Sequence, residues 1–221
     1  MSADTLSALS LSLRVAVLAT VVNAAVGIPL AYALARRRFR GRAVVDLLVT
    51  LPLVLPPTVT GYYLIVLLGR RGWLGAPLYQ ATGWTIAFTW YAAVVAATVM
   101  ALPLLVRTAR AAIESVDQDL EKAAYTLGRS EWRTALEVTL PLARNGILAG
   151  LVLAFARALG EFGATLMLAG NIPGRTTTVP LAIYTAVQTG ESGAALALVG
   201  ILTALSCVVL VAAARLGARA T

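Results

Sequence analysis

Long apolar runs separated by short arginine-rich segments constrain the fold of this chain more than any other feature. Five such runs occur, at about residues 11–35, 43–68, 84–106, 145–170 and 194–214. A helix of about 20 residues rises about 30 Å, which is the thickness of the hydrocarbon core of a bilayer. Each run is therefore long enough to cross a membrane. We predict an all-α integral membrane protein, a polytopic bundle of about five transmembrane helices that forms one domain over residues 1–221.

The composition agrees with a membrane protein and excludes several other classes. Hydrophobic residues make up 59% of the chain and charged residues only 13%, about half the charged share of a soluble domain. The net charge of +8 would suit nucleic-acid binding, but the arginines cluster between apolar runs and form no basic face with aromatics. The chain has one cysteine, Cys207, and no histidine, which argues against a disulfide framework and the usual metal sites. We expect no cofactor on this chain and no nucleic-acid partner.

The arginines also predict the orientation, because loops rich in Lys and Arg stay in the cytoplasm. The basic segments are residues 36–42, residues 107–144 and the C-terminal pair Arg215 and Arg219. The loops on the other side keep only Arg70, Arg71 and Arg175. Residues 1–10 lack the basic region and cleavage site of a signal peptide, so the first run should be a retained helix. We expect the N-terminus outside and the C-terminus in the cytoplasm.

The longest basic loop has the signals of two short helices joined by a turn. Ser115 and Gln118 match a capping box at the start of the first helix, and Gly128 suits its end. Ser130 can cap a second helix that Pro141 ends or kinks. An ordinary amphipathic hairpin would show the same signals, so they leave the role of the loop open.

The loop contains Lys122, Ala123 and Ala124, then Gly128 after three residues, and then Pro141. This spacing resembles the EAA loop of binding-protein-dependent ABC importer permeases, which reads EAA, three residues, Gly, nine residues and I-x-L-P. Gly128 and Pro141 stand at the family's separation. The resemblance implies a coupling helix within residues 107–144 that docks in a groove of a cytoplasmic ATPase.

Two departures from the family pattern occur in the loop. Lys122 occupies the usual Glu position, with Glu121 one residue earlier, and Val138 replaces Ile. A salt bridge from the usual Glu position therefore cannot be carried over. The chain also has no G-x-x-x-x-G-K-S/T phosphate loop, so we expect ATP and Mg to be bound by a partner ATPase and not by this chain.

The second apolar run contains a proline pair that should break its helix. Pro56 and Pro57 each remove a backbone donor, and the freed carbonyls cannot face lipid. Thr58 and Thr60, with Gly61 beside them, are candidates to satisfy these groups or to touch the solute. The alternative is a purely structural kink.

The fourth run holds two opposite charges, Arg157 and Glu161, four residues apart. A lone charge at mid-membrane costs about 2.5–3.5 kcal/mol on insertion scales, so the two should pair and face the bundle interior or a watery cavity. We expect the pair to border the translocation path or a subunit interface. A packing salt bridge without contact to the solute is the alternative.

Several longer segments are similar to the molybdate permease subunits of ABC importers. They are Leu51–Pro57, Phe155–Thr165, Ala169–Thr176 and Val179–Tyr184. Sulfate/thiosulfate permeases are the alternative, because they share the Gly-Glu and Asn-Ile-Pro portions. The resemblance implies a type I importer fold and adds Asn171 to the residues expected at the path or an interface. It also implies a homodimer, two ATPase subunits, an extracytoplasmic oxyanion-binding protein and a bacterial or archaeal cytoplasmic membrane.

The expected function is therefore to form the pathway of an ATP-driven oxyanion importer, with molybdate favoured and tungstate accepted. A channel or secondary transporter would also suit a broken helix and a buried charge pair, but it would not need the coupling loop. A membrane enzyme fits less well, because the chain lacks the His and Cys clusters of common catalytic sites.

Overall fold

The computed structural model describes residues 3–218, with the side chains of residues 5–211 and 215. These residues form helices and no β-strand. The helices are α1 (Ala3–Arg36), α2 (Arg42–Val54), α3 (Pro57–Leu68), α4 (Gly75–Thr82), α5 (Trp90–Glu114), α6 (Gln118–Thr126), α7 (Glu131–Thr134), the π-helical turn η1 (Ala135–Thr139), α8 (Leu140–Leu159), α9 (Gly163–Ala169), α10 (Val179–Gln188) and α11 (Ser192–Ala218).

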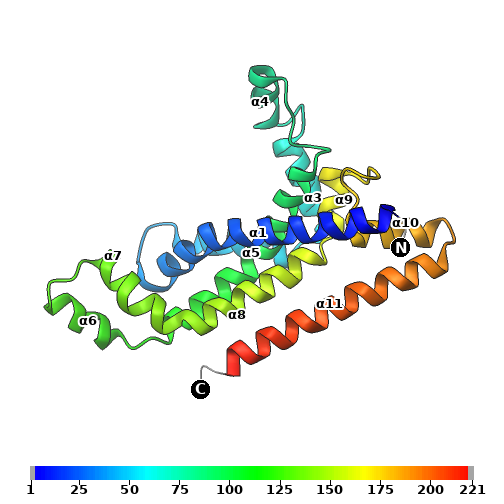
Figure 1. The fold of residues 1–221 in the computed structure, drawn as a ribbon. Helices are drawn as coiled ribbons and strands as arrows, with labels where there is room; N and C mark the ends of the chain where they lie inside the picture. Colours follow the sequence, from blue (N-terminus) through cyan, green and yellow to red (C-terminus); the bar gives the residue numbers. More distant parts are fainter. Residues whose placement is uncertain (1–2, 219–221) are drawn as a thin grey trace.

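Helix α5 is the centre of the bundle, with α1 and α8 packed along it (Figure 1). The face that α5 buries begins as a row of alanines, and Ala92, Ala93, Ala96 and Ala97 are fully buried. Lipid is as apolar as the helix, so association in a membrane depends on close packing, which small residues allow. The core is therefore built from near contact of backbones and from few large side chains.

Glycines on α1 and α8 bring these helices against α5. A Cβ atom on Gly146 of α8 would lie 2.4 Å from the Cβ of Ala112, and one on Gly27 of α1 would lie 3.0 Å from Cδ2 of Leu105. Real Cβ atoms do not approach within 3.0 Å of a neighbour. Any larger residue at Gly146 must therefore separate α8 from α5.

The predicted break in the second apolar run is confirmed, and the run forms two helices. Helix α2 ends at Val54 and α3 begins at Pro57. Leu55 and Pro56 between them are extended, with ψ angles of 144° and 136°. A residue before proline avoids the helical region, so two consecutive prolines remove two residues from the helix.

The fourth apolar run is also divided, which the sequence analysis did not predict. Helix α8 ends at Leu159 and α9 begins at Gly163. Among the described residues, four helices are long and apolar enough to span a membrane without interruption: Thr5–Arg36, Trp90–Glu114, Glu131–Leu159 and Ser192–Val211. A second crossing made of α2 and α3 would be a broken one.

The third of these uninterrupted helices shows that Pro141 does not end the second helix of the loop. The chain is helical from Glu131 to Leu159, and Pro141 stands in the first turn of α8, directly after the π-helical turn. Proline lacks the N–H that a continuous helix would use at this position, and the π-helical turn lies directly before α8. Pro141 therefore neither ends the helix nor separates the loop from the membrane segment.

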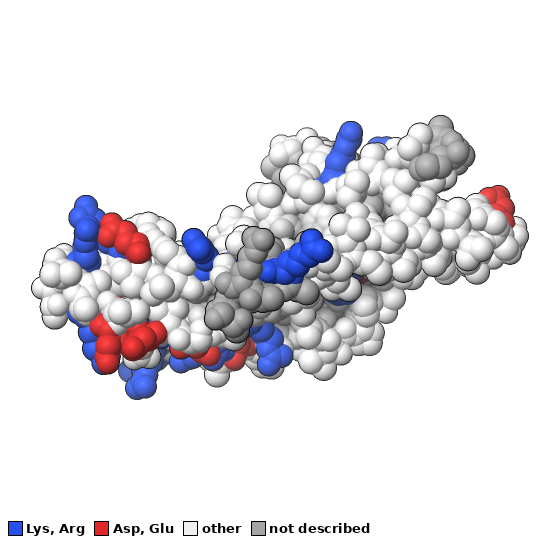
Figure 2. Space-filling model, turned by 60° about the horizontal axis from the view of Figure 1, so that its bottom comes forward, with Lys and Arg blue, Asp and Glu red and all other residues white. Residues whose placement is uncertain are grey.

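Charged side chains gather at one end of the molecule. The α1–α2 connection, α6 and α7 lie at this end, and the start of α1 and α10 lie at the other (Figure 1). Figure 2 shows most of the visible Lys, Arg, Asp and Glu side chains at the end that carries α6 and α7, with a largely uncharged surface beyond it. Arg219, which was grouped with this end from the sequence, lies outside the described residues.

We predict that Gly146→Ala destabilises the subunit, whereas Gly200→Ala on α11 does not. The added methyl group at Gly146 has no room beside Ala112, while a Cβ at Gly200 meets nothing within 4 Å. Overpacking costs about 1–3 kcal/mol, and Gly→Ala in an open helix position is neutral or stabilising. Thermal denaturation in detergent measures both changes, and equal melting temperatures for the two variants would contradict the packing described above.

Candidate functional site

The predicted helix-turn-helix is present at the charged end of the molecule. Helix α6 begins after Asp117, whose Oδ1 accepts a hydrogen bond from Asp119 N at 2.9 Å. The turn contains Gly128 at φ +78°, a left-handed conformation that suits glycine. Ser130 caps α7, with Oγ accepting a hydrogen bond from Arg133 N at 3.4 Å. The loop between α5 and α8 therefore has the folded form expected of a coupling helix.

The predicted capping box at the start of this loop is wrong. Ser115 is the C-cap of α5, directly after Glu114, and its hydroxyl donates to the Ala112 carbonyl at 2.8 Å. The cap of α6 is Asp117, two residues later. Both residues are good caps by type, and the choice follows from α5 continuing to Glu114, beyond the predicted end of its apolar run at residue 106.

Glu121 ties α6 to two membrane helices. Its Oε1 accepts a hydrogen bond from Arg36 Nε at 2.9 Å and another from the Thr139 hydroxyl at 2.7 Å. Arg36 also donates from Nη2 to the Val116 carbonyl at 2.8 Å. The side chains of Arg36 and Glu121 are each only 8% exposed. The last residue of α1, the start of the coupling loop and the π-helical turn before α8 are thus joined at one carboxylate.

This network accounts for Lys122 at the usual Glu position of the EAA pattern. Lys122, at the family's Glu position, faces solvent and pairs with Asp119 at 2.7 Å. That hydrogen bond raises the pKa of Lys122 and lowers the pKa of Asp119. Ala124 is buried and Ala123 is exposed. The carboxylate that connects α6 to the rest of the protein is therefore that of Glu121. The ion pair of Lys122 with Asp119 stays within α6.

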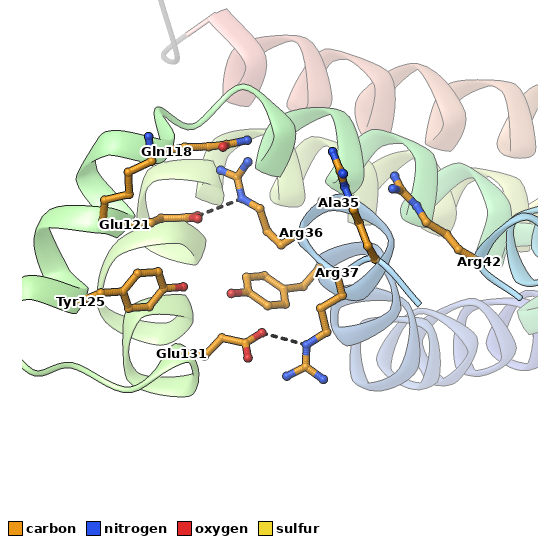
Figure 3. A pocket seen from close by; sticks show the side chains of 11 residues that line it. Ala35, Arg36, Arg37, Arg42, Gln118, Glu121, Tyr125 and Glu131 are labelled. Carbon is orange, nitrogen blue, oxygen red and sulfur yellow. Dashed lines mark hydrogen bonds and ion pairs between the residues drawn. The ribbon is translucent and has the colours of Figure 1, made fainter. Parts of the chain in front are cut away.

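A cavity of about 740 Å³ lies between the end of α1 and α6. In Figure 3 the side chains of Arg36 and Arg37 extend from α1 toward Glu121 and Glu131, with Tyr125 between these two acids. Arg37 Nε lies 2.8 Å from Glu131 Oε1, in a pair that is about half exposed. Burial, together with the charges of Glu121 and Glu131, raises the pKa of Tyr125, so its hydroxyl stays protonated at neutral pH. The cavity separates a buried ion pair from an exposed one.

Several large apolar side chains of the helix-turn-helix are exposed. Leu127 is 82% exposed and Trp132 is 67% exposed. Leu120, Tyr125 and Leu136 are also large, apolar and exposed. A patch of this kind at the charged end of a membrane protein indicates a protein-binding surface.

The two helix breaks meet in the middle of the molecule. A Cβ atom on Gly163, the first residue of α9, would lie 2.9 Å from the Cβ of Pro57, and one on Gly61 would lie 2.8 Å from Cα of Ala164. Helices α3 and α9 therefore pack through glycines. This contact buries the start of α9 at Gly163. At the α2–α3 break, Pro56, Pro57 and Thr58 remain exposed on the single subunit.

The predicted charge pair lies at this junction. Arg157 Nη2 is 2.7 Å from Glu161 Oε2, and Glu161 Oε1 accepts a hydrogen bond from Ala164 N at 2.8 Å. Glu161 is only 1% exposed, whereas Arg157 is 28% exposed. Glu161 follows the end of α8, so its carboxylate joins the end of that helix to the first turn of α9.

The structure brings together most of the residues predicted for the path, but it places Asn171 elsewhere. Pro57, Thr58, Arg157 and Glu161 line a cavity of about 220 Å³. Pro56 immediately precedes this group. Thr60 and Gly61 are buried on α3. Asn171 follows α9, donates to Thr185 Oγ1 at 2.8 Å and accepts from Thr177 Oγ1 at 2.7 Å.

Comparison with known proteins identifies the family. Residues 27–221 match the model of a protein family described as "Binding-protein-dependent transport system inner membrane component". The chain belongs to this family. Its members are multi-pass permease subunits of the inner membrane, which transport solute with a separate ATPase and a binding protein.

Individual relatives extend over most of the chain. The Molybdenum transport system permease protein ModB of Escherichia coli (strain K12) is 54% identical over 190 residues, covering 85% of this chain and 83% of that protein. ModB of Haemophilus influenzae is 49% identical over 184 residues, covering 83% and 80%. The Sulfate transport system permease protein CysW of Synechococcus elongatus is 38% identical over 215 residues, covering 96% and 74%.

Solved transporters share the fold. The MetNI methionine ABC transporter matches with a TM-score of 0.76 and 17% identity, with all of both chains covered. A bacterial alginate ABC transporter matches with a TM-score of 0.78 and 18% identity, covering 99% of this chain and 80% of that one. The resemblance to ABC importer permeases and the predicted type I importer fold are therefore confirmed.

In this permease family member, we predict that Glu121→Gln loosens the coupling loop, whereas Glu131→Gln does not. Removing one partner of a buried ion pair typically costs about 3–5 kcal/mol, against at most about 1 kcal/mol for an exposed pair. Hydrogen–deuterium exchange of the α6 peptides measures the effect, with at least about tenfold faster exchange expected for Glu121→Gln. Equal exchange in both variants would show that the Arg36 contact does not hold α6.

We predict that Glu161→Gln lowers the thermal stability of the subunit and that adding Arg157→Gln restores part of it. The single change leaves Arg157 without its counter-charge at the helix junction. The expected loss is about 1–3 kcal/mol, below the value for a fully buried pair because Arg157 is 28% exposed. Melting in detergent measures both variants, and wild-type behaviour of each single variant would make the pair irrelevant to the junction.

Proposed function

We propose that this chain forms the translocation pathway of an ATP-driven importer for an oxyanion, with molybdate as the solute and tungstate accepted. The 54% identity to a molybdenum permease over 85% of the chain carries this proposal. Sulfate permeases match at lower identity, 38% for CysW, so sulfate transport is the second candidate. Discrimination between these tetrahedral dianions can reside in the binding protein, whose pocket is built around one anion radius.

The working assembly is a homodimer of this subunit with two ATPase subunits and an extracytoplasmic oxyanion-binding protein. The exposed apolar patch with Leu127 and Trp132 supports docking of α6 and α7 in a groove of the ATPase. ATP and its Mg ion are bound there, and no cofactor is held by this chain. The coupling residues are those of the EAA segment: Glu121, Lys122, Ala123, Ala124, Gly128 and Pro141.

The charged end is cytoplasmic in this proposal, and the N-terminus of α1 is outside. The arginine-rich residues 36–42 and the coupling loop occupy the same end of the molecule (Figure 1). Loops rich in Lys and Arg stay in the cytoplasm, which supports this orientation. In this orientation, α4 and α10 lie toward the extracytoplasmic side.

One helix connects the surface that contacts the ATPase to the translocation path, so it transmits the movement of the ATPase. The chain is helical over 29 residues from Glu131 to Leu159, a length of about 43 Å at 1.5 Å per residue. Trp132 at one end contacts the ATPase, and Arg157 at the other end borders the break lined by Pro57 and Thr58. The Arg36–Glu121 pair makes α1 move with the same unit. Closing and opening of the ATPase pair therefore displaces the junction of α3, α8 and α9.

Uptake by the complex reconstituted with its own binding protein tests the proposal. Radiolabelled molybdate should enter vesicles only with ATP and should be competed by tungstate far better than by sulfate. Preferential uptake of sulfate would move the chain to the sulfate permeases. Uptake without any ATPase would instead indicate a channel or secondary transporter.

The coupling surface supplies a matched control for this experiment. Leu127→Asp should abolish ATPase association and uptake, because it places a charge in the apolar patch that docks on the ATPase. The fold should not change, because the Leu127 side chain is 82% exposed. Val187→Asp on α10, at another exposed apolar position that is 65% open to solvent, should retain ATPase association. If the Leu127→Asp variant still associates normally with the ATPase, this patch is not the coupling surface.

A further inference from the structure

The three arginines in the loops away from the charged end meet at one cavity. Arg70 and Arg71 follow α3, and Arg175 follows α9, more than a hundred residues later. All three line a cavity of about 700 Å³ between the α3–α4 connection and the segment before α5. Helices α3 and α9, which carry the two loops, pack side by side (Figure 1). The residues that line this cavity include no acid.

The positive charge in this cavity is not neutralised within the subunit. Arg71 and Arg175 form no ion pair among the described side chains, and both are exposed. Arg70 stacks on the ring of Tyr79, with Cζ 4.1 Å from the ring centroid, and donates a hydrogen bond to the Tyr79 hydroxyl. Stacking holds this guanidinium in place without removing its charge.

The walls of the cavity are apolar and are fixed to α9. Phe88 lines the cavity at φ +60°, the only positive φ of a non-glycine residue in the described part of the chain. Its N–H donates to the Leu168 carbonyl of α9 at 3.0 Å. A conformation of this kind costs about 1–3 kcal/mol and persists where the surroundings enforce it. Low-dielectric walls around several charges of one sign concentrate the field on an anion.

We infer that this cavity is a binding site for a tetrahedral oxyanion on the extracytoplasmic side of the subunit. Arg71 and Arg175 would bind the anion from opposite loops, and Arg70 would supply a third fixed charge. The planar guanidinium presents paired N–H donors that match two oxygens of an oxyanion. The site rests on the proposed function, because the solute released by the binding protein is the occupant, and it precedes the junction at Pro57 and Arg157 on the inward route.

Chemical protection of the arginines tests the site without relying on transport. The permease–ATPase complex is treated in detergent with phenylglyoxal, which modifies guanidinium groups, and the modified peptides are quantified by mass spectrometry. Molybdate or tungstate should slow modification of Arg71 and Arg175 severalfold relative to chloride at the same ionic strength. Arg40 and Arg144, exposed and at the charged end, should react equally in all samples.

The other occupants of a basic cavity give different results, each of which overturns the inference. Protection present before any oxyanion is added, and lost when lipid is removed, would assign the cavity to lipid phosphate groups. Protection that appears only with the binding protein, whether or not it carries an anion, would make the arginines a protein-docking surface. Equal modification with oxyanion and chloride would leave no anion site at all.

Uptake by a double variant provides the second measurement. Arg71→Gln with Arg175→Gln should lower molybdate uptake at limiting solute by about tenfold, as expected when electrostatic capture is lost. Arg107→Gln with Arg144→Gln removes the same charge from the other end and should leave uptake near wild type. ATPase association should be unchanged in both, and wild-type uptake by the outer double variant would overturn the inference.

The two proposals fail separately in these experiments. Protection of Arg71 and Arg175 in a complex that imports no molybdate would refute the proposed solute pathway and keep the anion site. Molybdate uptake without protection would keep the proposed function and refute the site. Protection by sulfate together with sulfate uptake would retain the site and change only the solute.

Discussion

A backbone group that faces lipid has no water to bind, and this constraint governs the whole subunit. It makes the long apolar segments helical, and it limits where a helix can be interrupted. Helices α2 and α3 are separated at Leu55 and Pro56, and α8 and α9 are separated between Leu159 and Gly163. The two interruptions pack against each other through Pro57, Gly61 and Gly163. Gly163 is buried at this contact, while Pro56 and Thr58 on the other side of it stay exposed on the single subunit.

The same junction is held by a buried carboxylate. Glu161 holds the end of α8 and the start of α9 together, with one oxygen on Ala164 N and the other on Arg157. At the opposite end of the same helical segment, Thr139 and Glu121 connect the coupling loop to Arg36 of α1. Both ends of the helix from Glu131 to Leu159 are thus fixed by a buried carboxylate. Such an element transmits displacement as a rigid body, which suits a subunit moved by an external ATPase.

Small residues make this arrangement possible. Alanines of α5 and glycines of α1 and α8 allow the three central helices to approach closely, since packing takes the place of the hydrophobic effect within a membrane. Large apolar side chains instead point outward, where they meet lipid or partner subunits. The described chain therefore has its small residues inside and many of its large ones outside, the reverse of a soluble domain.

The apolar runs, the proline pair and the EAA spacing determined the fold class, the break after α2 and the helix-turn-helix, because each depends on residues close together in the chain. The pairing of Arg157 with Glu161 was also predicted from helix periodicity, and it forms although α8 ends at Leu159, before Glu161. Only the tertiary structure decided that Glu121 binds Arg36, a partner 85 residues away, because no local pattern records which distant helix end lies beside a carboxylate. The break at residues 160–162 was not predicted either, because the fourth apolar run continues through it without a proline. The meeting of Arg70 and Arg71 with Arg175 likewise depends on the contact between α3 and α9, which brings together two loops that are far apart in the sequence.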